Sequence, residues 1–305
     1  MTTWKLNYNV FTLDNRQLIP SGTVVSNDIV EELISTYESP STKSFSFLQY
    51  GSIRDNALLF CSQAPSYNTI FADTKRTEAV LDLMEQVNVP YPILKIMDYF
   101  KLHDFYTYRH FIMVFMLSTL LAKDLIENHE DIKKEIFAGP THDIGKLCVP
   151  LNILKKTDPL TRPERLLLEH HTIAGYVLLS YYLGDSKNFS AIVARDHHER
   201  KDGSGYPCGV FLKDRIVEIV VVSDVYDALI SPRPYRRISY DNRTALEEIT
   251  AMAGKGKLSL EIVQALVAVN RKNRPYYSEC KVSLEHRGTP PSDNMYGIVV
   301  DKKEG

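Results

Sequence analysis

The sequence predicts a mainly α-helical protein that begins with a small α+β module. From residue 93 to about residue 270, apolar residues recur at three- and four-residue spacings, the period of helices that share a core. Residues 5–25 instead form short, partly alternating stretches between turn signals, which is typical of short strands. We therefore expect three regions, with Pro90 and Pro92 at the first boundary: an α+β module at 1–88, an all-helical domain at 89–287 and an irregular tail at 288–305.

The composition excludes several classes of protein. The chain has 305 residues, enough for two cores, and its 36 basic and 38 acidic side chains nearly balance. Such a balance argues against binding long nucleic acid, which needs a basic surface, but it allows a small anionic ligand. The N-terminus has no charged leader before an apolar core, and the apolar run 111–122 is too short to span a bilayer. We expect no membrane span and interpret this run as a buried helix.

The cysteines give a prediction about location. They lie far apart in the sequence and include no CxxC pair: Cys61, Cys148, Cys208 and Cys280. This usage favours a reducing compartment over a disulfide framework or a thiolate zinc site. We expect a cytoplasmic protein.

The N-terminal module has a simple predicted order. Short strands come first, and a helix then begins near Asn27 or Asp28, either of which can cap it. Residues 44–72 are mixed, and we expect further strands there, whereas 75–87 has the pattern of an amphipathic helix. The module carries no obvious chemistry. We expect it to serve dimerisation or regulation through a protein partner, with a purely stabilising role as the alternative.

The stretch THDIGKLCVP brings three chemical groups together. His142 and Asp143 are neighbours, and Lys146 lies over the same face if the segment is helical. An imidazole, a carboxylate and an ammonium then share one surface. Taken alone, an HD dipeptide also fits a solvated helix face, because such pairs occur by chance.

Two aspartates interrupt the apolar helix RIVEIVVVSDVYDALI. A carboxylate buried there must be paired or must coordinate a metal, since burying it alone is costly. For Asp224 metal coordination is the stronger interpretation. For Asp227 we expect an ion pair with one of the downstream arginines: Arg233, Arg236 or Arg237.

Together the polar residues form an inventory of nitrogen and oxygen donors without thiolate, sized for two transition-metal ions. Its members are His110, His142, Asp143, His171, His197, His198 and Asp224. Metal ions about 3.5–4 Å apart can share a bridging hydroxide and stabilise an in-line attack on phosphorus. Asp143 would bridge them, and Lys146 would stabilise the developing charge or protonate the leaving oxygen. Gly175, one turn after His171, lets another element come close.

Four stretches resemble the HD-GYP family, metal-dependent phosphohydrolases that typically hydrolyse cyclic di-GMP. They occur in the family's order and spacing: HDIGK at 142–146, LT at 160–161, HHERKDGSGYP at 197–207 and SDVYDALISPRPYR at 223–236. The resemblance implies metal ligation by the seven donors above, with Lys146 as the catalytic or substrate-contacting lysine. It places Tyr206 near the cleft, and Arg233 and Arg236 as contacts to the dinucleotide. The alternative for those arginines is pairing with Asp224 or Asp227.

Some positions depart from the family's pattern. Certain members add a glutamate one helical turn before the first histidine as a ligand for a third metal. Here that position is Tyr106, and Asp104 is out of phase, so we expect two metals. Leu151 stands where an aspartate is common, and residues 157–158 replace a usual Pro-Gly, which affects the loop beside the cleft.

These observations predict a two-metal phosphodiesterase that opens cyclic di-GMP by hydroxide attack to a linear dinucleotide, with GMP as a further product. Histidine and carboxylate ligands with open positions favour iron or manganese over zinc. One alternative is a catalytically weak module that signals through protein contacts of the N-terminal module or the GYP turn. Another is a phosphodiesterase for a different cyclic dinucleotide. A homodimer fits any of these.

Overall fold

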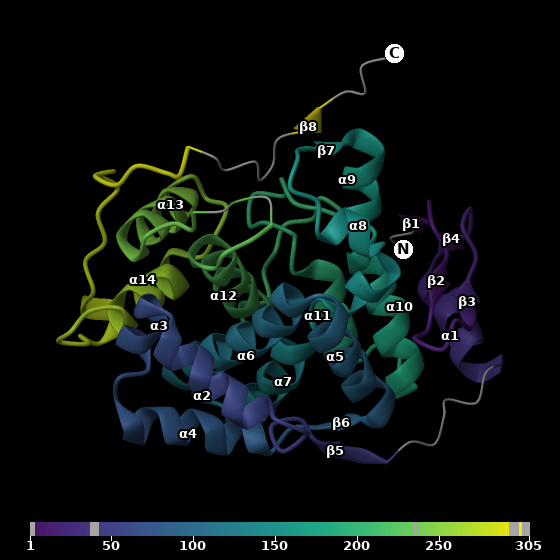
Figure 1. Cartoon of the computed structure of the whole chain (residues 1–305), viewed down its shortest axis with the longest axis horizontal. Coiled ribbons are helices and arrows are strands. Elements are labelled where there is room, and N and C mark those ends of the chain that lie inside the picture. The colour runs from purple at the N-terminus through teal and green to yellow at the C-terminus, as the bar shows by residue number, and fades with distance from the viewer. Residues whose placement is uncertain (1–3, 37–42, 235, 237, 293–298, 301–305) are drawn as a thin grey trace.

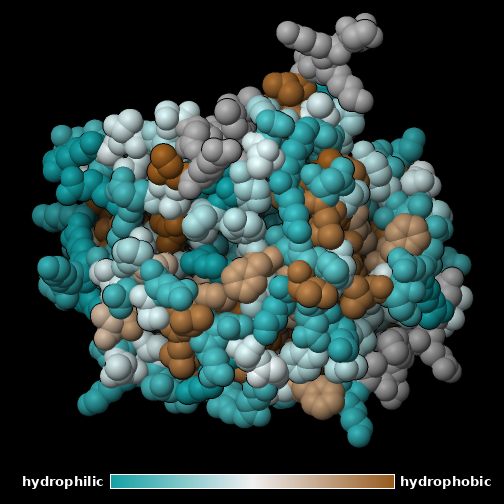
Figure 2. All heavy atoms as spheres, viewed as in Figure 1, coloured by the Kyte–Doolittle hydropathy of each residue, from teal (hydrophilic) through white to brown (hydrophobic). Residues whose placement is uncertain are grey.

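The computed structural model describes residues 4–36, 43–234, 236, 238–292 and 299–300. Helices make up its body, and short strands lie at the periphery (Figure 1), which confirms the predicted fold class. On the face shown in Figure 2, apolar side chains form separate patches among hydrophilic ones. All four cysteines are free thiols, as expected.

The first part of the chain forms two strand pairs and a helix. The antiparallel partners are β1 (Trp4–Lys5) with β4 (Val24–Val25) and β2 (Val10–Phe11) with β3 (Gln17–Ile19). Helix α1 (Asn27–Thr36) follows, so the predicted strands and the predicted helix start are both confirmed. The helical spacing of apolar residues in this stretch of the sequence continues to Tyr37, which lies outside the described residues. Helix α1 and strand β2 both contact helix α10 (His171–Leu183).

Residues 44–90 were predicted only in part. Strand β5 (Ser44–Ser46) pairs antiparallel with β6 (Asn88–Pro90), but most of the expected strand region is helical. Helix α2 packs through Ile53, Ala57 and Phe60, a spacing of four and three residues that our prediction of strands overlooked. The helices are α2 (Ile53–Gln63), α3 (Pro65–Ile70) and α4 (Thr74–Glu85), of which α4 confirms the amphipathic helix.

Helix α6 (Phe105–Leu125) is the centre of the core. Neighbours from both ends of the chain contact it, among them α2, α4, α5 (Tyr91–His103), α7 (His129–Ala138), α12 (Arg215–Ile230) and α14 (Leu260–Val269). By length and composition α6 could cross a membrane, but 83% of its apolar window is buried inside the protein. It is therefore the core helix of the fold, which confirms the burial expected for 111–122.

The remaining elements surround the loops that carry the sequence motifs. They are η1 (Gly139–Thr141), η2 (Ile144–Cys148), α8 (Leu151–Leu154), β7 (Leu160–Thr161), α9 (Arg162–Glu169), α11 (Phe189–Asp196), α13 (Asn242–Gly254), η3 (Tyr277–Glu279) and β8 (Val299–Val300). Strand β8 lies parallel to β7, and the other described tail residues form no helix or strand.

One hydrophobic cluster joins the predicted module to the predicted domain. Buried side chains of 4–36 and 44–90 belong to the same cluster as those of α6, α10 and α12. Phe47, for example, packs edge to face against Phe115 of α6, with ring centroids 5.4 Å apart. The division at residue 88 stays a prediction.

Prediction: Phe115→Ala lowers the free energy of unfolding of the metal-free protein by about 3–5 kcal/mol, because it leaves a cavity in the shared core. Leu102→Ala is the control, since Leu102 is 78% exposed and its loss changes stability by less than about 0.5 kcal/mol. The measurement is urea denaturation followed by circular dichroism. A wild-type curve with two separate transitions would contradict the continuous core.

Candidate metal centre

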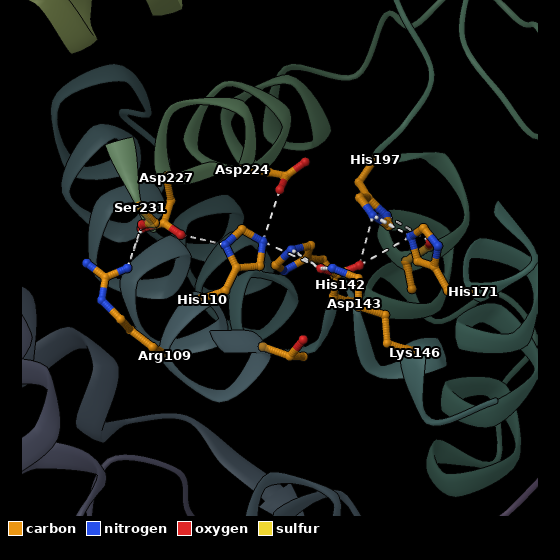
Figure 3. A network of polar contacts seen from close by, with 12 residues as sticks. Arg109, His110, His142, Asp143, Lys146, His171, His197, Asp224, Asp227 and Ser231 are labelled. Carbon is orange, nitrogen blue, oxygen red and sulfur yellow. Dashed lines mark hydrogen bonds and ion pairs between the residues drawn. The ribbon is translucent and has the colours of Figure 1, made fainter. Parts of the chain in front are cut away.

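The predicted donors converge from five separate parts of the chain (Figure 3). His110 lies on α6, and the pair His142–Asp143 sits between η1 and η2. His171 begins α10, and Asp224 lies on α12. His197 and His198 follow directly after α11. All these residues except His198 are classed as buried.

Asp143 is shared between two clusters of donor atoms. Within each cluster the donor atoms lie no more than 4.8 Å apart, and the clusters are Asp143 with His171, His197 and His198, and Asp143 with His110 and His142. Its Oδ1 lies 3.2 Å from Nε2 of His171 and 3.5 Å from Nε2 of His197. Its Oδ2 lies 3.5 Å from Nε2 of His110 and 3.5 Å from Nε2 of His142. One oxygen thus faces each cluster, as a bridging carboxylate requires.

Asp224, on α12, lies beside the cluster formed by Asp143, His110 and His142. Its Oδ1 lies 3.0 Å from Nε2 of His110. The structure therefore brings all seven predicted donors into one neighbourhood.

Hydrogen bonds at Nδ1 orient the rings of three of the histidines. Nδ1 of His142 lies 2.8 Å from the Gly139 carbonyl, Nδ1 of His171 lies 2.6 Å from the Leu168 carbonyl, and Nδ1 of His197 lies 2.9 Å from the Ala194 carbonyl. In each case the acceptor is the third residue before the histidine. Because a carbonyl only accepts, each Nδ1 carries the proton, and the Nε2 lone pair faces Asp143.

Two buried atoms of the centre have no hydrogen-bond partner in the described part of the chain. They are Nε2 of His142 and Oδ1 of Asp143. A buried polar atom left unpaired costs about 1–3 kcal/mol, and neither atom carries a proton with which to satisfy the other. A cation bound between them would satisfy both, so the residues present fit a metal.

A sequence model described as HD domain matches residues 93–262, more than half of the chain. The chain belongs to the HD domain family. Its HDIGK and GYP motifs place it in the HD-GYP branch, and membership implies divalent metal binding. That implication agrees with the two donor clusters.

Several curated relatives are similar to this HD-GYP chain. It is 34% identical over 205 residues to a cyclic di-GMP phosphodiesterase of Thermotoga maritima, which covers 64% of this chain and 55% of the relative. It is 33% identical over 229 residues to cyclic di-GMP phosphodiesterase PA4108 of Pseudomonas aeruginosa (70% and 53% covered). It is 33% identical over 174 residues to 3'3'-cGAMP-specific phosphodiesterase 1 of Vibrio cholerae (56% and 39% covered).

The HD-GYP chain spans about half the length of the two cyclic di-GMP phosphodiesterases that it matches. Among solved structures, the HDG"Y"P protein Bd1817 from Bdellovibrio bacteriovorus aligns with a TM-score of 0.46 and 15% identity, over 86% of this chain and 93% of that one. This likeness is too weak to bear on the fold.

The charges of the HD-GYP centre suit a metal. Burial lowers the pKa of His171 to about 3 and holds the pKa values of His142 and His198 below their usual range. Burial opposes ionisation of Asp143, but Lys146 and His142 outweigh it and hold the carboxyl pKa well below its usual range. At neutral pH these residues are neutral imidazoles and a carboxylate, the forms that bind metal.

His110 is the exception. Burial and the Arg233 guanidinium lower its pKa, yet hydrogen bonds to the carboxylates of Asp143, Asp224 and Asp227 outweigh both and raise it to about 9. Without metal this histidine is an imidazolium at neutral pH. A metal ion that binds its Nε2 must displace a proton.

Asp227 contacts the Nδ1 side of the His110 ring, away from the Nε2 atom that faces Asp143. Its Oδ2 lies 2.6 Å from Nδ1 of His110, while its Oδ1 accepts hydrogen bonds from Tyr67 (2.8 Å), Ser231 (2.9 Å) and Arg109 (3.2 Å). From the sequence we expected only an ion pair at this aspartate.

The expected ion pair with a downstream arginine is present, but it is longer than the other contacts of Asp227. Arg233 lies 3.7 Å from Oδ2 of Asp227, and Arg237 lies outside the described residues. The role of Asp227 in orienting His110 was missed. One signal was available, because Asp227 follows Asp224 by three residues and so shares its helix face.

Close backbone contacts position the motif loops. A Cβ added to Gly145 would lie 1.9 Å from the His171 carbonyl oxygen and 2.3 Å from the Gly175 nitrogen. This contact confirms that Gly175 lets another element approach. A Cβ on Gly205 would lie 2.4 Å from the His198 carbonyl oxygen, so the GYP loop also needs its glycine.

The rest of the GYP loop supports His198. The Tyr206 ring stacks on the His198 ring, with centroids 4.6 Å apart. Behind the loop, the buried Glu199 carboxylate accepts hydrogen bonds from the backbone amides of residues 208–210. Tyr206 therefore helps to orient His198 as well as lining the cleft predicted beside it.

A cleft of about 330 Å³ opens beside the donor clusters. Nζ of Lys146 contacts Oδ2 of Asp143. The basic residues that line the cleft are Lys146, Lys156, Arg165, Arg200, Arg233 and Arg236. Arg236 was predicted to contact substrate, and it lines the cleft but is only 2% exposed. Its Nη2 donates to the carbonyls of Ala228, Leu229 and Ser231. This geometry favours capping of the α12 C-terminus over a substrate contact.

Prediction: Gly145→Ala displaces η2 from α10 and separates Asp143 from His171, so metal bound by the purified protein falls below one ion per chain. Gly175→Ala is the milder control, because its Cβ would come no closer to another atom than 3.2 Å, the distance to the Ala194 Cβ. Elemental analysis after reconstitution with manganese measures the difference. Two ions retained by Gly145→Ala would contradict the account.

Prediction: binding of Mn²⁺ at pH 7.5 releases more protons from the wild type than from Asp227→Asn. The Asp227 carboxylate helps to keep the pKa of His110 at about 9, so below that pH the metal displaces a proton. Wild-type affinity should accordingly rise with pH up to about 9, while the variant should level off at a lower pH.

The measurement is calorimetric titration in two buffers that differ in ionisation enthalpy. Asp158→Asn is the control, since this exposed carboxylate lines the same cleft but forms no hydrogen bond or ion pair with His110. Equal proton release from wild type and Asp227→Asn would refute the coupling.

Proposed function

We propose that this protein is a metal-dependent cyclic dinucleotide phosphodiesterase acting on cyclic di-GMP. The observation that carries the proposal is Asp143, whose two oxygens face separate donor clusters beside a cleft with basic lining. The relatives, which include cyclic di-GMP and 3'3'-cGAMP phosphodiesterases, support the same substrate class.

Seven residues are proposed as ligands of two divalent ions: His110, His142, Asp143, His171, His197, His198 and Asp224. When bound, such ions supply Lewis acidity toward the phosphate and lower the pKa of water toward neutrality. We propose iron or manganese, because imidazole and carboxylate donors without thiolate suit both. Two ions fit better than three, since Asp104 is engaged with Thr107, 2.7 Å away, and Tyr106 has no metal-binding group of the usual kind.

The protein's own residues would handle charge in the reaction. Hydrolysis forms one bond from a water oxygen to phosphorus and breaks one bond from phosphorus to a ribose oxygen, which takes up a proton. Lys146 lies in the cleft against Asp143, where its ammonium would stabilise the phosphoryl charge or protonate the departing oxygen. The product would be a linear dinucleotide, and a second hydrolysis would give GMP.

A phosphodiesterase for 3'3'-cGAMP is the second candidate, because relatives with that name match this chain at 32–33% identity. Dimerisation, regulation through the N-terminal module and a cytoplasmic location stay predictions.

Prediction: replacing both His142 and Asp143 with alanine lowers the metal content from two ions per chain to less than one. Hydrolysis of cyclic di-GMP should fall at least about 1,000-fold, because the variant loses the bridging carboxylate and a histidine donor. Elemental analysis and a hydrolysis assay on the same manganese-loaded samples measure both effects, and circular dichroism checks the fold. A folded double variant that still holds two ions would overturn the ligand assignment.

A further inference from the structure

Helix α13 contributes two side chains to the lining of the cleft. Glu248 and Met252 lie four residues apart and so share one face of this helix, and both line the cleft. Leu229, Pro234 and Tyr240 line the cleft as well. Apart from Glu248, these side chains offer a mainly apolar surface of the kind on which a nucleobase can lie.

Glu248 is a half-buried carboxylate that forms no hydrogen bond or ion pair with any residue that the structure describes. The other carboxylates lining the cleft are different. Asp143 and Asp224 belong to the metal centre, and Asp104 accepts a hydrogen bond from Thr107. Asp158 is exposed to solvent.

A carboxylate at this position opposes binding of an anionic ligand unless the ligand brings N–H donors to it. Glutamate is acceptor-only when ionised and can accept two parallel hydrogen bonds. Guanine presents such a pair, N1–H and N2–H, on its Watson–Crick edge. Adenine presents a lone pair at N1 on the same edge, which a carboxylate repels.

We propose that Glu248 is the base-reading residue of this cleft and selects cyclic dinucleotides that contain guanine. The inference rests on the proposed function and deepens it. Guanine occurs twice in cyclic di-GMP and once in 3'3'-cGAMP, so both can place a guanine against Glu248. Cyclic di-AMP has no guanine and is rejected.

The test is Glu248→Gln, assayed as the manganese-loaded full chain on cyclic di-GMP, 3'3'-cGAMP and cyclic di-AMP. Glutamine replaces one acceptor with an N–H donor, which mismatches guanine and matches the N1 and amino group of adenine. We expect kcat/KM for cyclic di-GMP to fall about 10- to 100-fold, the loss typical of a hydrogen bond to a charged group. For cyclic di-AMP kcat/KM should rise, so the ratio of kcat/KM for cyclic di-GMP to that for cyclic di-AMP falls further.

The control is Glu279→Gln, which removes the same charge from an exposed position that does not line the cleft. It should leave the ratio unchanged. Glu248→Ala serves as a second variant, and it should lose the preference for guanine without gaining cyclic di-AMP. Metal content and melting temperature confirm that each variant is intact.

The outcomes separate the two claims. If the wild type hydrolyses cyclic di-GMP and neither Glu248 variant changes its rate relative to cyclic di-AMP by more than twofold, the base-reading role is overturned and the proposed function stands. If the manganese-loaded wild type hydrolyses none of the three nucleotides, both are overturned.

Discussion

The buried carboxylate of Asp143 is the constraint around which this structure is organised. Burial of a charge is unfavourable, and here the carboxylate remains ionised because Lys146 and the surrounding imidazoles favour its charged form. Its two oxygens face different donor clusters, so each candidate ligand must be held beside the oxygen of its own cluster. The 3₁₀ turns on both sides of the pair His142–Asp143 and the close approach of Gly145 to α10 provide that placement.

The first residues of the chain support the same loops from outside. The indole of Trp4 donates to the Cys208 sulfur (3.0 Å), one residue beyond the GYP turn. The Cys148 thiol donates to the Phe11 carbonyl (3.4 Å), two residues beyond Lys146. The strands of the N-terminal region therefore contact both motif loops. This packing explains why its hydrophobic core is continuous with that of the helices around the metal centre.

The sequence was sufficient for the parts of the site that local motifs encode. His142, Asp143, His197 and His198 form two adjacent pairs, and the resemblance to the HD-GYP family implied the remaining donors. It was not sufficient where a role depends on distant partners. Asp227 contacts a histidine 117 positions away, and no local pattern distinguishes that contact from an ordinary ion pair.

For the fold, too, the features encoded by local sequence were predictable and those that depend on distant contacts were not. The long apolar period of α6 and the cap of α1 were predictable, because both are local signals. Helices α2 and α3 were missed, because short helices with mixed composition resemble strands until their packing against α6 is known. The helix-capping contacts of Arg236 depend on where α12 ends in space, which a motif does not specify.

The most direct test of the account is a crystal structure of the manganese-loaded protein with anomalous scattering recorded near the manganese edge. The account predicts two peaks on opposite sides of the Asp143 carboxylate, about 3.5–4 Å apart, each beside one donor cluster. A single peak, or two peaks that do not flank Asp143, would contradict it.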